Sequence, residues 1–194
     1  MKSISNKQTL SYLNLVDLET YSFKLDDTEH KYFGKKNSKI LLNKNASDAL
    51  LNAQNMLPSK FKFVISSGYR DYDTQFKINE FMKEKLKKKY PNNWQEQLDI
   101  FTGGEDYLEY IKNTSIDKLS HISHASGNAV DIVGIIDDKN KSLNFGGQHN
   151  DKRDCIDYYK SSIIADNRKL LKKILTENKF ENYKHEWWHW GYLN

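Results

Sequence analysis

Apolar and polar residues along this chain follow two different periods, one typical of helices and one typical of strands. Residues 47–56 place alanine, leucine and methionine at helical spacing, with Ser47 as the expected N-cap. Residues 61–66 (FKFVIS) alternate with period two and are rich in strand formers. Residues 129–136 (AVDIVGII) are the clearest strand candidate. Helices and strands are therefore interspersed, which predicts an α+β domain.

The remaining apolar pattern predicts four more helices and a strand-like C-terminus. One helix begins after Asp71 or Asp73 as N-cap and ends in the basic run KEKLKKK. The other helices are expected at 93–101, 104–112 and 167–178, and the aromatic, strand-like segment at 180–192. The predicted architecture is a small antiparallel sheet with flanking helices.

Length and composition limit the class of protein. The chain has 194 residues, enough for one domain with a sizeable core, and we predict a single domain over 1–194. With 38% hydrophobic and 13% aromatic residues, disorder is not expected. A single cysteine, Cys155, cannot form an internal disulfide. Neither a signal peptide nor a run of about 18 apolar residues is recognisable, so the expected location is the cytosol.

The net charge of +4 is too small to specify a nucleic-acid partner. The lysine run at 83–89 is expected to be the solvated end of a helix, where cations are favourably placed. We therefore expect neither a nucleic-acid nor a membrane partner. An acidic substrate, such as a cell-wall peptide, is compatible with this charge.

The segment HISHASGNAVDIV contains the first candidate metal ligands. Asp131 is an acid in the middle of an apolar strand, and burying its carboxylate is costly unless a cation or several donors meet it. His124 lies on the loop that enters this strand, and Gly127 would let the backbone bend close to a metal. Zinc accepts imidazole nitrogen and carboxylate oxygen alike, so His124 and Asp131 are candidate zinc ligands. A salt-bridged acid and a hydrogen-bonded loop histidine are the alternatives.

The segment HEWWHWGY contains a third ligand candidate and an acid. His189 would complete three protein ligands, the usual open arrangement of a catalytic zinc. Glu186 lies among tryptophans, and apolar surroundings raise the pKa of a carboxylate and suit it to proton transfer. We expect Trp187, Trp188 and Trp190 to be largely core residues that also exclude water from the site.

A rival motif overlaps this segment, since His185 to His189 matches H-E-x-x-H, a helical zinc motif. Three tryptophans with no run of good helix formers favour a strand instead. Only five residues follow His189, and the motif leaves His124 and Asp131 unexplained. Both interpretations retain Glu186 and His189.

Arg70, directly after the strand at 61–66, is a candidate for stabilising the oxyanion formed when a carbonyl is attacked. The alternative is a salt bridge to Asp71 or Asp73.

The order Arg70, His124-x(6)-Asp131 and Glu186-x-x-His189 resembles the zinc D-Ala-D-Ala dipeptidases of vancomycin resistance. Their superfamily also holds D-Ala-D-Ala carboxypeptidases, L-Ala-D-Glu endolysins and the hedgehog signalling domain. The resemblance runs from about Ser47 to the C-terminus and includes the Asn-Arg-x-x-Leu helix at 167–171.

The resemblance implies a hedgehog-like zinc fold, with Zn²⁺ on His124, Asp131 and His189. It implies Glu186 as general base and Arg70 facing the reacting carbonyl. We also expect Ser123 and Tyr69 to contact the substrate, a small peptide for which D-Ala-D-Ala is the first choice.

Two positions depart from the family pattern and leave other peptide substrates open. Ile122 stands where a serine is usual, and Gly146 follows Phe145 where the dipeptidases tend to have an aspartate that helps hold the substrate amino group. Asp151 or Asp154 could replace that acid. The alternatives are a D,D-carboxypeptidase, an L-Ala-D-Glu-type endopeptidase, or a zinc-binding domain without turnover.

Overall fold

The computed structural model describes residues 12–26, 39–148 and 152–194. These residues divide into two compact units, one made of the described residues up to Tyr69 together with His121–Asn194, and the other made of Arg70–Ser120. Helices and strands are interspersed along the chain, so the predicted α+β class is confirmed. The single metallopeptidase domain over 1–194 stays a prediction.

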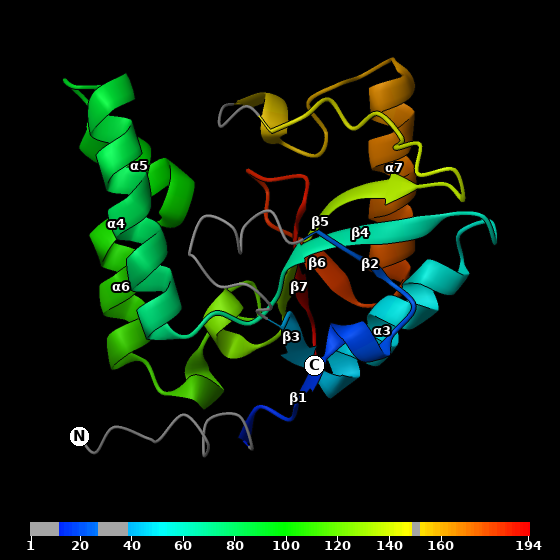
Figure 1. Ribbon diagram of the computed structural model, residues 1–194, viewed down its shortest axis with the longest axis horizontal. Helices are drawn as coiled ribbons and strands as arrows, with labels where there is room; N and C mark the ends of the chain where they lie inside the picture. The colour runs from blue at the N-terminus through cyan, green and yellow to red at the C-terminus, as the bar shows by residue number, and fades with distance from the viewer. Residues whose placement is uncertain (1–11, 27–38, 149–151) are drawn as a thin grey trace. The chain divides into compact units, whose positions relative to one another are not determined.

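A five-stranded sheet is the scaffold of the first unit (Figure 1). The strands, in spatial order, are β2 (Lys24–Leu25), β4 (Lys62–Ser67), β5 (Ala129–Ile136), β7 (His189–Tyr192) and β6 (Phe180–Asn182). The pairs from β4 to β6 are antiparallel as predicted, but β2 runs parallel to β4. The expectation of a purely antiparallel sheet is wrong at this edge, because two residues are too few to show a period in the sequence. A separate antiparallel pair joins β1 (Leu15–Asp17) to β3 (Leu41–Asn43).

Two helices contribute to the core beneath this sheet, α3 (Lys44–Asn55) and α7 (Ile163–Glu177). Their buried leucines share one cluster with Ile65 of β4 and with Val130 and Ile132 of β5. Because side chains alternate along a strand, Asp131 points to the opposite face from Val130 and Ile132. The apolar core and the candidate site therefore lie on opposite faces of the same strand.

Both of these helices begin earlier than the sequence pattern predicted. The N-cap of α3 is Asn43, whose side chain accepts a hydrogen bond from Asn45 N, and Ser47 lies inside the helix. Ser162 caps α7 through Ala165 N. The expected cap at Ser47 is wrong because Asn43, also a strong capping residue, precedes a polar first turn that carries no apolar signal.

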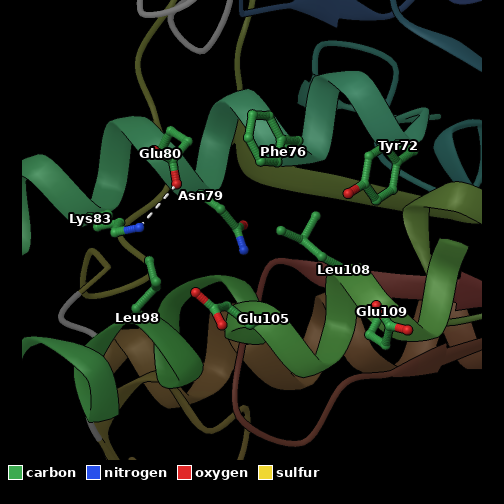
Figure 2. A pocket seen from close by; sticks show the side chains of 9 residues that line it. All are labelled: Tyr72, Phe76, Asn79, Glu80, Lys83, Leu98, Glu105, Leu108 and Glu109. Atoms are coloured by element: carbon green, nitrogen blue, oxygen red, sulfur yellow. Dashed lines mark hydrogen bonds and ion pairs between the residues drawn. The ribbon is translucent and has the colours of Figure 1, made fainter.

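The second unit consists of three helices and the short turn η2 (Ile116–Lys118). The helices are α4 (Tyr72–Lys89), α5 (Trp94–Thr102) and α6 (Gly104–Asn113). Asp71 caps α4 through Thr74 N, as one of the two predicted alternatives, and lysines occupy its last turn. Asn79 is buried and donates to Gly104 O at 2.8 Å, which ties α4 to the start of α6. A hollow of about 200 Å³ lies between these helices. Figure 2 shows Asn79 directed into it and Glu80 paired with Lys83.

Across the described ranges, the structure contains no helix that combines the length and apolar character needed to cross a bilayer.

Candidate metal centre

Three residues far apart in the sequence, His124, Asp131 and His189, meet on one face of the sheet. One ligand atom from each lies within 4.8 Å of the others. All three side chains are buried, with relative exposures of 5%, 4% and 7%. Sequence reasoning therefore predicted the convergence correctly, and the set could hold a metal ion.

The sheet itself brings Asp131 and His189 together. They are direct partners across the antiparallel strands β5 and β7. Asp131 Oδ1 lies 2.8 Å from His189 Nδ1. Directly opposed residues on antiparallel strands have neighbouring side chains, so the register alone places these two groups in contact.

His124 reaches the pair from the short 3-10 helix η3 (His124–Ser126). Its Nε2 lies 3.2 Å from Asp131 Oδ2, and its ring meets the His189 ring edge-on at 4.7 Å. Gly127 ends η3 with φ +77 and donates its N–H to the carbonyl of His124. This left-handed conformation suits glycine and turns the chain directly into β5.

Main-chain carbonyls fix the orientation of both imidazoles. His124 Nδ1 bonds to Gly68 O at 2.6 Å, and His189 Nε2 bonds to Ile122 O at 2.7 Å. Because a carbonyl oxygen only accepts, the bonded nitrogen of each ring carries the hydrogen. His124 Nε2 and His189 Nδ1 then face Asp131: without a metal His189 Nδ1 donates a hydrogen bond to the carboxylate, and once deprotonated the two nitrogens offer lone pairs to a metal. This is the arrangement by which outer hydrogen bonds orient metal-binding histidines, so the donor set fits zinc.

Two glycines allow these carbonyls to approach. A side chain at Gly68 would lie 2.2 Å from Leu41 O, and one at Gly191 would lie 2.6 Å from His121 O. Gly191 therefore lets the segment that contains Ile122 lie directly against β7. Sequence reasoning missed both carbonyls, because a backbone acceptor has no residue signature; the glycines in SSGYR and HWGY were the available signals.

The protein groups alone form a strongly coupled charge cluster. Burial by itself would raise the pKa of Asp131, but the charges and hydrogen bonds of His124 and His189 hold that pKa well below its ordinary value. Burial would lower the pKa of His189, yet the hydrogen bond and charge of Asp131 outweigh it and raise that pKa. The carboxylate is therefore the ionised centre of the site, as a metal-binding acid must be.

Glu186 lies in the turn between β6 and β7, three residues before His189. Its N–H bonds to Tyr183 O at 2.9 Å, and its carbonyl accepts from His189 N at 3.2 Å. Its negative charge contributes to the raised pKa values of His189 and Tyr183, although burial is the larger cause for Tyr183. The charge of Glu186 therefore acts on the imidazole of the predicted ligand His189.

Asn182 connects this acid to the ligand by a bond that the sequence did not reveal. Its Nδ2 donates to Glu186 O at 2.9 Å and to His189 O at 3.0 Å. One amide therefore fixes the turn in which Glu186 and His189 are the two ends. An asparagine in a strand-like segment carries no signal for such a role.

The tryptophans pack as predicted, with exposures of 2% for Trp187, 8% for Trp188 and 0% for Trp190. The segment forms turns followed by strand β7, so the strand interpretation is correct and the helical H-E-x-x-H alternative is not supported. His185 is exposed and contacts the ring of Tyr183 at 5.4 Å.

The remaining predicted residues lie as follows. Tyr69 is half-buried and donates its N–H to Leu41 O, and Ser123 caps η3 through Ala125 N. Arg70 is the first residue of the second unit. Roles for all three in substrate binding or catalysis stay predictions.

A comparison with protein families now adds to this geometry. The D-Ala-D-Ala dipeptidase family, peptidase M15, matches residues 23–193. The chain belongs to this family. No individual curated protein matches it. Members of the M15 family are zinc-dependent metallopeptidases. The chain is therefore a metallopeptidase, with His124, Asp131 and His189 as its possible metal site.

Proposed function

We propose that this M15 peptidase hydrolyses a short D-Ala-containing peptide, with zinc held by His124, Asp131 and His189. The observation that carries the proposal is the orientation of the two imidazoles, whose second nitrogens converge on one buried carboxylate. When bound there, zinc supplies a Lewis acid that lowers the pKa of a water molecule to about 7.

Glu186 is the general base in this proposal. It accepts a proton from the attacking water and then delivers it to the nitrogen of the leaving amine as the carbon–nitrogen bond breaks. Its fixed turn beside His189 supports this role. Arg70 holds the negative charge that develops on the carbonyl oxygen, and Ser123 and Tyr69 contact the substrate.

Free D-Ala-D-Ala is the first substrate to test, but Gly146 favours a second candidate. Gly146 has φ +85, and a Cβ there would lie 3.2 Å from Ile164 and Tyr159, so an aspartate would be strained. Asp154 is buried at 1% exposure, and Asp151 lies outside the described residues. Without an acid at 146 to hold a free amino group, a longer peptide is favoured, as in a D,D-carboxypeptidase or an L-Ala-D-Glu-type endopeptidase.

The deciding experiment replaces Glu186 by glutamine and measures both zinc content and hydrolysis. We expect Glu186→Gln to keep one zinc per chain and to lose hydrolysis by at least about 100-fold, as expected for loss of general base catalysis. The matched control is Glu181→Gln, an exposed acid that pairs with His121 at 2.7 Å. Full activity in Glu186→Gln would refute the mechanism, and absence of turnover in the parent protein would favour a zinc-binding domain without catalysis.

The substrate is tested with D-Ala-D-Ala, D-Ala-D-lactate and a stem pentapeptide. Cleavage of the free dipeptide supports a dipeptidase. Cleavage of the pentapeptide but not of the dipeptide supports the carboxypeptidase or endopeptidase alternative.

A further inference from the structure

Arg168 is a fully buried cation outside the metal centre, and the proposed mechanism does not use it. It lies on α7 in the Asn-Arg-x-x-Leu segment and is 1% exposed. A buried guanidinium is costly unless its donors are satisfied. Its partners therefore indicate what it stabilises.

The partners of Arg168 are backbone carbonyls in the connection between β5 and α7. Nε donates to Phe145 O at 2.9 Å, while Nη1 donates to Arg153 O at 2.7 Å and to Cys155 O at 2.8 Å. The neighbouring Asn167 donates to Asn144 O at 2.8 Å. Two adjacent side chains of α7 thus tie the segments at 144–145 and 153–155 to one helix.

Trp187 is held between residues 145–147 and Asp154, and these contacts are called the clamp on Trp187 below. The Phe145 ring stacks on the Trp187 ring at 4.9 Å with an interplanar angle of 7°. Trp187 Nε1 donates to Gly147 O and its backbone N–H donates to Asp154 O, both at 2.8 Å. The Arg168 guanidinium itself lies 5.4 Å from the centre of the Trp187 ring, within the range of a cation–π contact.

Trp187 directly follows Glu186 and precedes His189 by two residues. We propose that Arg168 is a positioning residue, which holds the clamp on Trp187 and thereby fixes Glu186 and His189 relative to each other. The inference rests on the proposed function for the roles of these two residues. Lysine cannot replace Arg168, because an ammonium lacks the planar fork that reaches separate carbonyls while lying against a ring.

The test compares Arg168→Lys with the parent in the full chain. We expect the affinity for zinc, measured by chelator competition, to fall about 10-fold, as for other residues that orient metal ligands. Hydrogen exchange at the indole and backbone N–H of Trp187, followed by NMR, should accelerate at least about 10-fold. With the peptide that the parent cleaves, kcat should fall by a similar factor while KM stays within about threefold.

Leu175→Ala is the matched control, because it removes a fully buried side chain from the core face of the same helix. We expect it to lower stability but to leave the zinc affinity and the exchange at Trp187 unchanged. Asn167→Ala removes the bond to Asn144 O and should shift the same readouts in the same direction by a smaller factor. It decides the question if Arg168→Lys does not fold.

Native exchange at Trp187 together with native zinc affinity in a folded Arg168→Lys or Asn167→Ala protein would overturn the inference. Equal effects in Leu175→Ala would also overturn it, because they would indicate general destabilisation. Full activity in Glu186→Gln would instead refute the proposed function, and the zinc and exchange measurements would still decide the role of Arg168.

Discussion

The two faces of the β5–β7 pair differ sharply, although their residues alternate one by one in the sequence. On one face Val130 is opposite Trp190 in the apolar core, and on the other Asp131 is opposite His189 in the candidate site. The core face is held by non-directional packing, whereas the site face is held by hydrogen bonds to specific carbonyls. Stability and metal binding should therefore respond to different substitutions on the same strands.

The largest effect is expected on the site face. Asp131→Ala removes the only carboxylate of the three-residue site, so the protein should lose stoichiometric zinc and hydrolysis should fall at least about 1000-fold, or about 4 kcal/mol in activation free energy. Metal analysis and a peptide hydrolysis assay measure both quantities. The control is Asp157→Ala, an exposed acid paired with Lys172, which should change stability by less than about 1 kcal/mol.

On the core face, Ile132→Ala should have the opposite profile. Ile132 is fully buried, and such truncations cost about 2–5 kcal/mol in the free energy of unfolding. Zinc content should remain one per chain, and kcat should stay within a few-fold. Urea denaturation with metal analysis tests this, and loss of zinc in a folded variant would mean that the two faces are not separable.

Gly127 lies where the chain passes from η3 to the strand, and its replacement should have a smaller effect. Gly127→Ala places a Cβ at φ +77 and 2.9 Å from Leu15 Cδ2, which should cost about 1–2 kcal/mol for the left-handed backbone. Zinc affinity should weaken moderately because His124 is adjacent. Unchanged stability would show that the turn tolerates a side chain.

The smallest expected effect concerns the pH dependence of stability, which should differ between the zinc-free protein, prepared with a chelator, and the zinc-loaded protein. In the zinc-free protein, burial lowers the pKa of His189, but the hydrogen bond and charge of Asp131 raise it above the ordinary value of 6.5. This interaction stabilises the folded protein fully below pH 6.5, and the contribution is lost as pH rises through the folded-state pKa. The lowered pKa of Asp131 contributes above its ordinary value of 3.8 and fails only in stronger acid.

The chelated protein should therefore lose stability as pH rises above 6.5, with a slope of at most about 1.4 kcal/mol per pH unit from His189. The stabilisation by zinc should instead grow with pH, because zinc requires unprotonated imidazoles. Urea denaturation from pH 5.5 to 8.5, with and without chelator, measures both trends. Parallel curves would contradict the coupling of His189 to Asp131.

The sequence predicted those parts of the site that reside in side chains. An acid within an apolar strand, a histidine on the loop before that strand and a histidine in the C-terminal segment identified Asp131, His124 and His189. The aromatic content around Glu186 identified the C-terminal strand region. The long strand at 129–136 also agrees with the structure, because its apolar run is strong.

The parts that the sequence did not reveal depend on backbone groups and on short elements. The carbonyls of Gly68 and Ile122 orient the imidazoles, but every residue type has a backbone carbonyl, so no residue type marks such a position in the sequence. The two-residue strand β2 is too short for a period, and the starts of α3 and α7 depend on caps that precede the apolar pattern. The bonds of Asn182 become apparent only when the turn is folded.

The main-chain oxygens of Gly68 and Ile122 orient the two imidazoles, but these two positions should differ in how much they tolerate substitution during evolution. At Gly68 any side chain would collide with Leu41 O, so this position should accept almost no variation. At position 122 the acceptor is present whatever the side chain, so Ile122→Ser should leave zinc affinity intact. The centre can thus retain its metal while residue 122 diverges, which leaves this lineage room to change its preferred peptide without rebuilding the chemistry.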